Sequence, residues 1–282
     1  MSRIAYVNGR YVPHLDAAVH IEDRGFQFAD GVYEVVAIHG GRFFDEDPHL
    51  DRLSRSLREV RIPEPMSRAA LKHVMRELLR RNGIRDGIIY LQISRGVARR
   101  DHAFPKNVPP SLVMTAKRSK PLSNTLIEEG VAVITIPDIR WKRCDIKSLS
   151  LLPNVLGKQE ARDAGAYEAW MVDETGMVTE GTSTNAWIVN DAGEIVTRQA
   201  DDTILNGVTR LTIKQLAASR GLEIQERPFD LSEARAAREA FLTSTTSLVL
   251  PVVRIDGRNV ADGRPGPISR QLRRLCEDVL KQ

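Results

Sequence analysis

The feature that most limits the fold is a change of pattern partway along the 282-residue chain. Up to about residue 118, apolar residues recur at both strand and helical spacing, whereas short strand-like segments predominate beyond it. The polar, proline-containing stretch between the two patterns is typical of a linker. The chain is also long enough for two domains. These patterns predict a small α/β domain at 1–118, a linker at 119–123 and a larger domain at 124–282.

The first domain is predicted to combine a hairpin, further strands and two helices. Asn8-Gly9 lies between two apolar runs, which is a strong hairpin signal. Both helices show apolar residues at helical spacing, and the second ends at Asn82-Gly83. The predicted segments are a hairpin at 4–12, strands at 32–38, 88–94 and 111–116, one helix capped by Asp47 and a second helix starting near Ser67.

The second domain is predicted to be built mainly from short strands separated by turns. The expected strands lie at 131–136, 167–172, 177–179, 185–189 and 195–196, and the expected helices at 206–221 and 267–280. Strands at this spacing favour a curled, barrel-like sheet. The fold class predicted for the whole chain is therefore α+β.

Composition excludes several classes of protein. The formal net charge is +4 with no long basic tract, and the Arg-rich stretch 52–58 has the spacing of a solvated helix face, so nucleic-acid binding is not expected. The two cysteines, Cys144 and Cys276, are too few for a disulfide framework or a zinc site. We find no leader-like apolar segment and no membrane-length apolar run. We therefore expect a cytoplasmic protein without membrane partners.

The sequence also lacks the commonest catalytic motifs. There is no Walker P-loop, no HExxH, no CxxC pair, no Gly-x-Ser-x-Gly and no GxGxxG. Nucleotide-binding and hydrolase functions are accordingly disfavoured, and no metal site is predicted.

Lys147 is the first residue that offers distinctive chemistry. It lies beside Ile146 and two residues before Leu149, between a Trp-containing strand-like segment and an apolar run. A lysine in such surroundings loses solvation of its ammonium group, and its amine can act as the nucleophile that a Schiff base requires. Spacing alone does not distinguish it from a surface lysine.

Three polar segments downstream of Lys147 could hold a cofactor. Glu180 ends a predicted strand, and its carboxylate could bond to a protonated ring nitrogen or belong to a polar β-turn. Gly207 and Thr209 open a helix, where free amide groups suit a phosphate or an ordinary cap forms. Five hydroxyl residues at 243–247 could add hydrogen bonds to the phosphate or form a polar strand end.

In this order, these segments resemble the fold-type IV class of pyridoxal-5′-phosphate (PLP) enzymes, the branched-chain aminotransferase-like class. The likeness covers nearly the whole chain. It rests on the segments 22–35, 49–53, 140–141 and 145–149 and on those around Glu180, Gly207 and Thr245. It implies a small α/β N-terminal domain, a larger PLP-binding domain with a barrel-like sheet, and transfer of amino groups.

The resemblance implies a role for each candidate residue. Lys147 would form the Schiff base with PLP and move the proton, and Glu180 would pair with the pyridine nitrogen. Arg52 would bind the phosphate as a charged fork. The remaining cofactor residues implied are Leu205 against the ring and Gly207, Val208, Thr209 and Ser244 or Thr245 around the phosphate.

The segment 94–105 indicates the substrate. Within this class the likeness is greatest to the bacterial D-amino-acid aminotransferases, in which an Arg-x-His pair and a tyrosine bind the substrate α-carboxylate. Here these residues are Arg100, His102 and Tyr33, and Arg99 could share the role of Arg100. The implied reaction moves an amino group between a D-amino acid and a 2-oxo acid, of the type D-alanine plus 2-oxoglutarate to pyruvate plus D-glutamate, in a homodimer.

Other functions remain open on the same scaffold. These are an (R)-amine transaminase, an L-branched-chain aminotransferase and an aminodeoxychorismate lyase, besides a non-catalytic PLP-binding protein and a purely structural one. Arg100 and His102 argue against the amine transaminase and the lyase.

Overall fold

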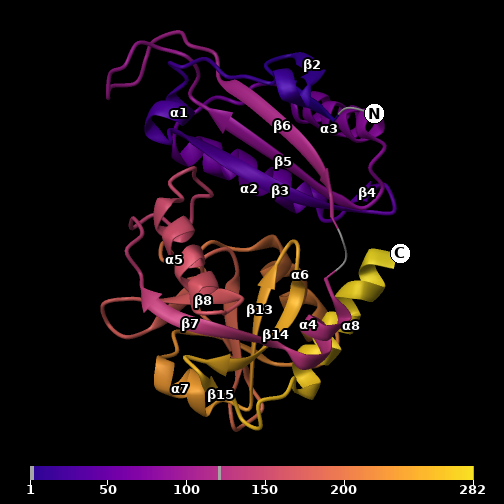
Figure 1. The fold of residues 1–282 in the computed structure, drawn as a ribbon, viewed down its shortest axis with the longest axis vertical. Helices are drawn as coiled ribbons and strands as arrows, with labels where there is room; N and C mark the ends of the chain where they lie inside the picture. The colour runs from indigo at the N-terminus through magenta and orange to yellow at the C-terminus, as the bar shows by residue number, and fades with distance from the viewer. Residues whose placement is uncertain (1–2, 120–121, 282) are drawn as a thin grey trace. The chain divides into compact units, whose positions relative to one another are not determined.

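The computed structural model describes residues 3–119 and 122–281, and the chain divides into two compact units (Figure 1). The first unit is Met1–Lys120 with Ile146–Ser150, and the second is Pro121–Asp145 with Leu151–Gln282. Lys147 therefore belongs to the first unit, although the chain on both sides of it belongs to the second. The domain boundaries expected from the sequence stay a prediction, and residues 120–121 of the expected linker lie outside the described residues.

The first unit is a six-stranded antiparallel sheet in the order β2-β1-β6-β5-β3-β4, with two long helices packed on it. Its strands are β1 (Ile4–Val7), β2 (Arg10–Pro13), β3 (Gly31–His39), β4 (Arg42–Phe43), β5 (Gly87–Ser94) and β6 (Ser111–Arg118), and its helices are η1 (His14–Asp16), α1 (Arg24–Phe28), α2 (Glu46–Glu59) and α3 (Arg68–Asn82). The helix α2 contacts β3, and α3 contacts β1 and β6. The predicted strands, hairpin and helices of this unit are confirmed.

Two details of α2 differ from the expectation. The residue before the helix is Asp45, with a left-handed φ of 52°, so the predicted cap at Asp47 is wrong; Asp47 instead pairs with Arg68 and Lys72. Helical periodicity alone places Arg52 on a solvated face, but its side chain is only 10% exposed and pairs with Glu34 on β3. Helical periodicity cannot reveal a partner carboxylate on another element.

The second unit is a nine-stranded sheet with helices around it. The path of paired strands is β12-β11-β10-β13-β14-β7-β8-β9, and β15 pairs with β14. Its strands are β7 (Val131–Pro137), β8 (Glu168–Val172), β9 (Val178–Gly181), β10 (Asn185–Val189), β11 (Ile195–Thr197), β12 (Ile224–Glu226), β13 (Glu239–Ser244), β14 (Leu248–Ile255) and β15 (Arg258–Asn259), and its helices are α4 (Asn124–Glu129), α5 (Leu152–Asp163), α6 (Val208–Ala218), α7 (Leu231–Ala236) and α8 (Pro267–Lys281).

This sheet curls, as the sequence predicted (Figure 1). The strand β9 is the last in this order of paired strands, and β10 is the third from the other end. The two strands are nevertheless joined by a short connection, at residues 182–184. The amide of Gly181 donates to the carbonyl oxygen of Thr184 at 2.7 Å in this short connection. Alternate residues of β10 face two cores: Ile188 packs with Trp170 and Phe229, whereas Trp187 joins a cluster that includes residues of α6 and α8.

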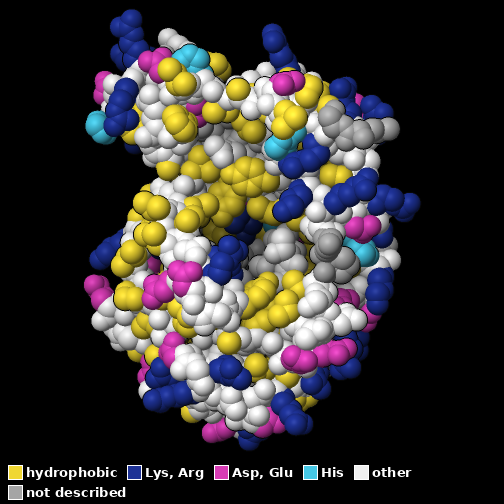
Figure 2. Space-filling view, viewed as in Figure 1, with side chains coloured by type: hydrophobic (Ala, Val, Ile, Leu, Met, Phe, Trp, Pro, Cys, Tyr) yellow, Lys and Arg dark blue, Asp and Glu magenta, His cyan; other side chains and the backbone are white. Residues whose placement is uncertain are grey.

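The surface of the described residues carries both signs of charge. On the face in Figure 2, Lys and Arg side chains are interspersed with Asp and Glu over both units. Within residues 3–119 and 122–281, no helix has the length and apolar character needed to cross a membrane.

Candidate active site

Lys147 lies in a short extended segment beside β3 of the first unit. The amide of Tyr33 donates to the carbonyl oxygen of Lys147 at 3.0 Å, and the amide of Leu149 donates to that of Gly31 at 3.0 Å. Glycine is required at position 31, because a Cβ atom there would lie 2.5 Å from the Ile93 carbonyl oxygen on β5 and 2.8 Å from Leu149 Cδ1. Backbone pairing with β3 therefore positions the lysine.

The Lys147 amine faces an aromatic ring. Its Nζ atom lies 4.2 Å from the ring centroid of Tyr33, a cation–π distance. The Tyr33 ring in turn lies 5.8 Å from that of Tyr90, and burial raises the pKa of the Tyr90 phenol to about 12. The structure thus brings together two predicted site residues, Lys147 and Tyr33.

Arg52 is held by a buried carboxylate. Its Nε and Nη2 atoms lie 2.7 and 2.8 Å from the two oxygens of Glu34, and His49 Nδ1 lies 2.8 Å from Glu34 Oε2. Burial alone would raise the pKa of Glu34, but Arg52 and His49 hold it at about 2, whereas burial lowers the pKa of His49. Glu34 therefore fixes the orientation of the guanidinium group that the sequence assigns to the phosphate.

This cluster predicts a pH-dependent stability. The pKa of Glu34 is about 2 in the folded protein and usually 4.5, so its ionised form contributes about 3 kcal/mol to the free energy of unfolding. Because the folded pKa is the lower one, this contribution is present above pH 4.5 and is lost as the pH falls toward 2. Urea unfolding at pH 7, 5 and 3 should show a smaller loss on acidification in Glu34→Gln than in the wild type. Equal losses would contradict this assignment.

Arg100 and His102 lie exposed in the loop between β5 and β6. Both pack on Phe28: the Arg100 Cζ atom lies 4.5 Å from its ring centroid, and the ring centroids of His102 and Phe28 are 5.4 Å apart. The structure brings this predicted pair together. Among the described residues, no hydrogen bond or ring contact joins either of them to Tyr33, so the three-residue carboxylate site stays a prediction.

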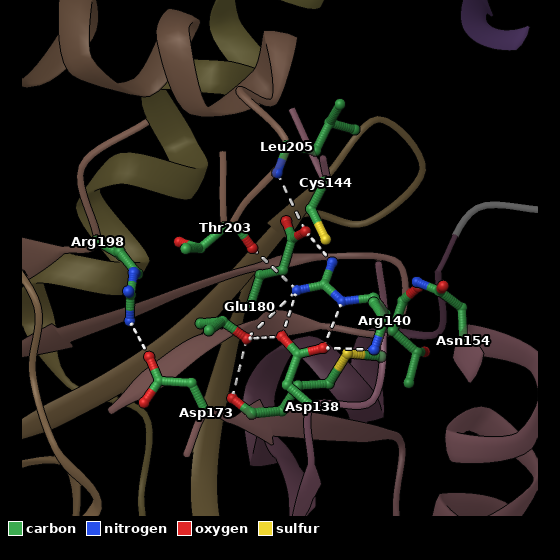
Figure 3. Close-up of polar contacts among 12 residues, drawn as sticks. Asp138, Arg140, Cys144, Asn154, Asp173, Glu180, Arg198, Thr203 and Leu205 are labelled. Carbon is green, nitrogen blue, oxygen red and sulfur yellow. Dashed lines mark hydrogen bonds and ion pairs between the residues drawn. The ribbon is translucent and has the colours of Figure 1, made fainter. Parts of the chain in front are cut away.

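In the second unit, Glu180 is a buried carboxylate with several donors around it (Figure 3). It forms an ion pair with Arg140 and accepts hydrogen bonds from the Asn185 side chain at 3.0 Å and the Leu205 amide at 3.1 Å. Burial raises the pKa of Glu180, and the Arg140 guanidinium opposes that rise. The donors stabilise the charged form that would bind a protonated ring nitrogen.

Arg140, which pairs with Glu180, is also bound by a second carboxylate, that of Asp138. Its Nε and Nη2 atoms lie 2.9 and 2.7 Å from the two oxygens of Asp138, and Nη2 donates to the Thr203 carbonyl oxygen at 3.1 Å (Figure 3). Burial disfavours the charged guanidinium, but the carboxylates of Glu180 and Asp138 raise its pKa. Arg140 belongs to a segment used for the family resemblance, yet no local pattern showed that it contacts Glu180, forty residues away in the sequence.

The start of α6 offers an anion site. Gly207 is its N-cap and provides no side-chain cap, and the first amides of a helix have no partner within it. A Cβ atom at position 207 would collide with Asn185 Oδ1. Any other residue would therefore push the backbone at the helix start away from Asn185. Val208 and Thr209 follow as buried residues. This arrangement suits a phosphate, as the sequence predicted for these residues.

Ser244 and Thr245 lie where β13 turns into β14. The Ser244 hydroxyl oxygen is 2.7 Å from that of Ser247 and accepts the Ser247 amide at 3.1 Å. Ser244 therefore already stabilises the turn, which fits the polar strand end that the sequence left open; Thr245 is half-buried.

One asparagine links the two cofactor elements of the second unit. Asn185 donates to Glu180 at 3.0 Å and to the Leu205 carbonyl oxygen at 2.9 Å, and its oxygen lies against Gly207. A carboxylate for a ring nitrogen and a helix start for a phosphate are thus held by one side chain, and these residues fit the two ends of PLP. No local pattern marks Asn185 as a site residue; the available signal is a polar residue at the start of the apolar strand β10.

Comparison with known proteins identifies the family. The model of the class IV aminotransferases matches residues 31–255. The D-alanine aminotransferase of Listeria innocua is 43% identical over 278 residues, which cover 98% of this chain and 96% of the relative.

Solved structures of branched-chain amino acid aminotransferases share the fold of this chain. The branched-chain amino acid aminotransferase of Escherichia coli superposes with a TM-score of 0.92 at 24% identity, over 99% of this chain and 95% of the other. Another branched-chain amino acid aminotransferase, solved with pyridoxamine 5′-phosphate, gives a TM-score of 0.91 at 26% identity, over 99% of this chain and 94% of the other.

The chain belongs to the class IV aminotransferases. It has the fold-type IV architecture and is a PLP-dependent aminotransferase, which confirms the fold class, the enzyme class and the cofactor predicted from the sequence. Its substrates are accordingly amino acids and 2-oxo acids.

Proposed function

We propose that this protein transfers the amino group of a D-amino acid to a 2-oxo acid, with D-alanine and 2-oxoglutarate as a representative pair. The observation that carries the proposal is the 43% identity, over 98% of this chain, to a protein named D-alanine aminotransferase. The branched-chain enzymes share the fold at 24–26% identity, so they support the L-branched-chain alternative less strongly.

In this proposal Lys147 handles the proton. Bound PLP withdraws electrons from the substrate Cα atom and so makes its hydrogen acidic. The Nζ atom of Lys147 would then take the proton from Cα as a general base and return it, as a general acid, to the C4′ carbon of the cofactor. The Tyr33 ring, 4.2 Å from Nζ, restricts where the amine can point.

The other predicted residues bind and orient. We propose that Glu180, kept charged by Arg140 and Asn185, binds the pyridine nitrogen. Arg52, oriented by Glu34, binds the phosphate. The remaining proposed contacts are Leu205 against the ring, Gly207, Val208, Thr209, Ser244 and Thr245 around the phosphate, and Tyr33, Arg100 and His102 for the substrate α-carboxylate.

A substrate panel tests the proposed activity. The purified holoenzyme should convert D-alanine with 2-oxoglutarate faster than L-leucine with 2-oxoglutarate, 1-phenylethylamine with pyruvate, or aminodeoxychorismate. The last three substrates represent the L-branched-chain, (R)-amine and lyase alternatives. Activity with one of them and with no D-amino acid would replace the proposal by that alternative.

Arg100→Ala tests the carboxylate contact. In this variant the substrate carboxylate has no guanidinium group to bind. The KM for D-alanine should therefore rise by about 10- to 100-fold, because a hydrogen bond to a charged group contributes about 1.5–3 kcal/mol. An amine without a carboxylate should show no such rise. Lys106→Ala is the matched control, since it removes another exposed cation from the same loop. Unchanged KM values in Arg100→Ala would refute the contact.

The homodimer and the cytoplasmic location remain predictions. Light scattering on the purified protein measures the first, and fractionation of cells that express the protein measures the second.

A further inference from the structure

Arg24 is a buried arginine that binds the loop carrying Arg100 and His102. Its side chain is 4% exposed. Its Nη1 atom donates to the carbonyl oxygen of Asp101 at 2.5 Å, and Nη2 donates to that of His102 at 3.4 Å. One guanidinium group therefore holds two consecutive backbone carbonyls of the loop.

The guanidinium group of Arg24 is anchored at its other end. Its Nε atom lies 2.8 Å from Asp30 Oδ2, and Asp30 also binds Nε and Nη2 of Arg95 at 2.8 and 2.9 Å. Burial acts to raise the pKa of Asp30, but the two arginines lower it. The backbone agrees with this anchoring, because the Arg24 amide donates to the Gly96 carbonyl oxygen at 2.9 Å. Arg24 thus connects the loop to a fixed point of the first unit.

Phe28, on the same short helix α1, completes the contact. The Arg24 Cζ atom lies 4.9 Å from its ring centroid, and Arg100 and His102 lie against the same ring at 4.5 and 5.4 Å. Arg24 holds the loop backbone, and Phe28 supports the two side chains. The backbone of this loop and the side chains of Arg100 and His102 thus both contact residues of α1.

We infer that Arg24 is a positioning residue for recognition of the substrate α-carboxylate. It sets the backbone from which Arg100 and His102 reach the carboxylate. This inference rests on the proposed D-amino-acid function and on the proposed role of Arg100. Its signature is a loss of carboxylate affinity at unchanged cofactor binding.

Arg24→Lys and Arg24→Gln test the inference. Lysine keeps a cation beside Asp30 but has no planar fork to bind two carbonyls at once, so the fold is retained and the loop is released. Both variants should raise the KM for D-alanine about 10-fold, with kcat changed less than about 3-fold and with the PLP dissociation constant and absorbance spectrum unchanged. In an Arg100→Ala background, Arg24→Lys should add less than about a 2-fold further rise in KM, because the two residues act on one contact.

Arg198→Lys is the matched control. Arg198 forms a comparable buried ion pair, with a side chain 10% exposed and a 2.8 Å bond to Asp173, but it belongs to the second unit. The KM of Arg198→Lys for D-alanine should equal that of the wild type.

The outcomes separate the two claims. If Arg100→Ala raises the KM and Arg24→Lys does not, the inference is overturned while the proposed function stands. Equal losses of melting temperature, PLP affinity and kcat in both Arg24 variants would also overturn it, because they indicate a purely structural role. A wild-type enzyme inactive with every D-amino acid would overturn the proposed function, and this inference with it.

Discussion

Lys147→Ala should lower the rate of transamination at least ~10³-fold, since a positioned general acid–base group contributes about 10²–10⁴-fold and, in the proposed role, the amine would also serve as nucleophile toward the cofactor. The expected defect is specific to chemistry, because backbone bonds to Tyr33 place Lys147 and its side chain forms no ion pair with any described residue. Steady-state rates with D-alanine and 2-oxoglutarate measure it, together with the visible absorbance of bound PLP.

Lys142→Ala provides the control for this result. Lys142 is an exposed lysine five residues earlier in the chain, so its removal changes the same charge without touching β3. Its activity should equal that of the wild type. A Lys147→Ala enzyme with wild-type turnover would show that another amine carries the proton.

Glu180→Gln slows turnover by about 10²–10³-fold while PLP stays bound. Glutamine retains the hydrogen bonds of Glu180 to neighbouring donors in part, but it cannot stabilise a positive charge on the ring nitrogen, and one well-placed electrostatic contact contributes about 10²–10³-fold. Arg140 also loses the carboxylate that it pairs with, which weakens the compensation of a buried cation. The rate of the half-reaction with D-alanine and the PLP dissociation constant together measure this effect.

Glu239→Gln controls for the loss of a buried carboxylate. Glu239 accepts from the amides of Ile268 and Ser269 at 2.8 and 2.9 Å and is as buried as Glu180. The Glu239→Gln enzyme should be less stable than the wild type but keep the same turnover per bound PLP. If Glu180→Gln keeps full turnover, the ring nitrogen has another partner.

Much of the fold could be predicted from the sequence because the signals are local. The Asn8-Gly9 turn, the helix start near Ser67 and the strand at 185–189 each depend on a few residues, and each matches the structure. The helices α1, α4, α5 and α7 were not predicted. The segment that forms α5 is apolar at its start, and its Leu152 and Val155 are exposed, so it lacks the buried stripe that marks an amphipathic helix.

The candidate site could be predicted only in part, because its decisive contacts join distant residues. The family resemblance indicated Lys147, Glu180 and Arg52, but Glu34 binds Arg52 from 18 residues away and Arg140 binds Glu180 from 40. Lys147 belongs to the first unit because its segment forms backbone hydrogen bonds with β3. No sequence pattern around the lysine predicts this pairing.

The most direct test of the account is a half-reaction without an acceptor. Holoenzyme mixed with D-alanine alone should lose the visible absorbance of its PLP form and release one pyruvate per active site, whereas L-alanine and L-leucine should leave the spectrum unchanged. Lys147→Ala should show no conversion with either enantiomer. Conversion by L-leucine, or no conversion by any D-amino acid, would contradict the account.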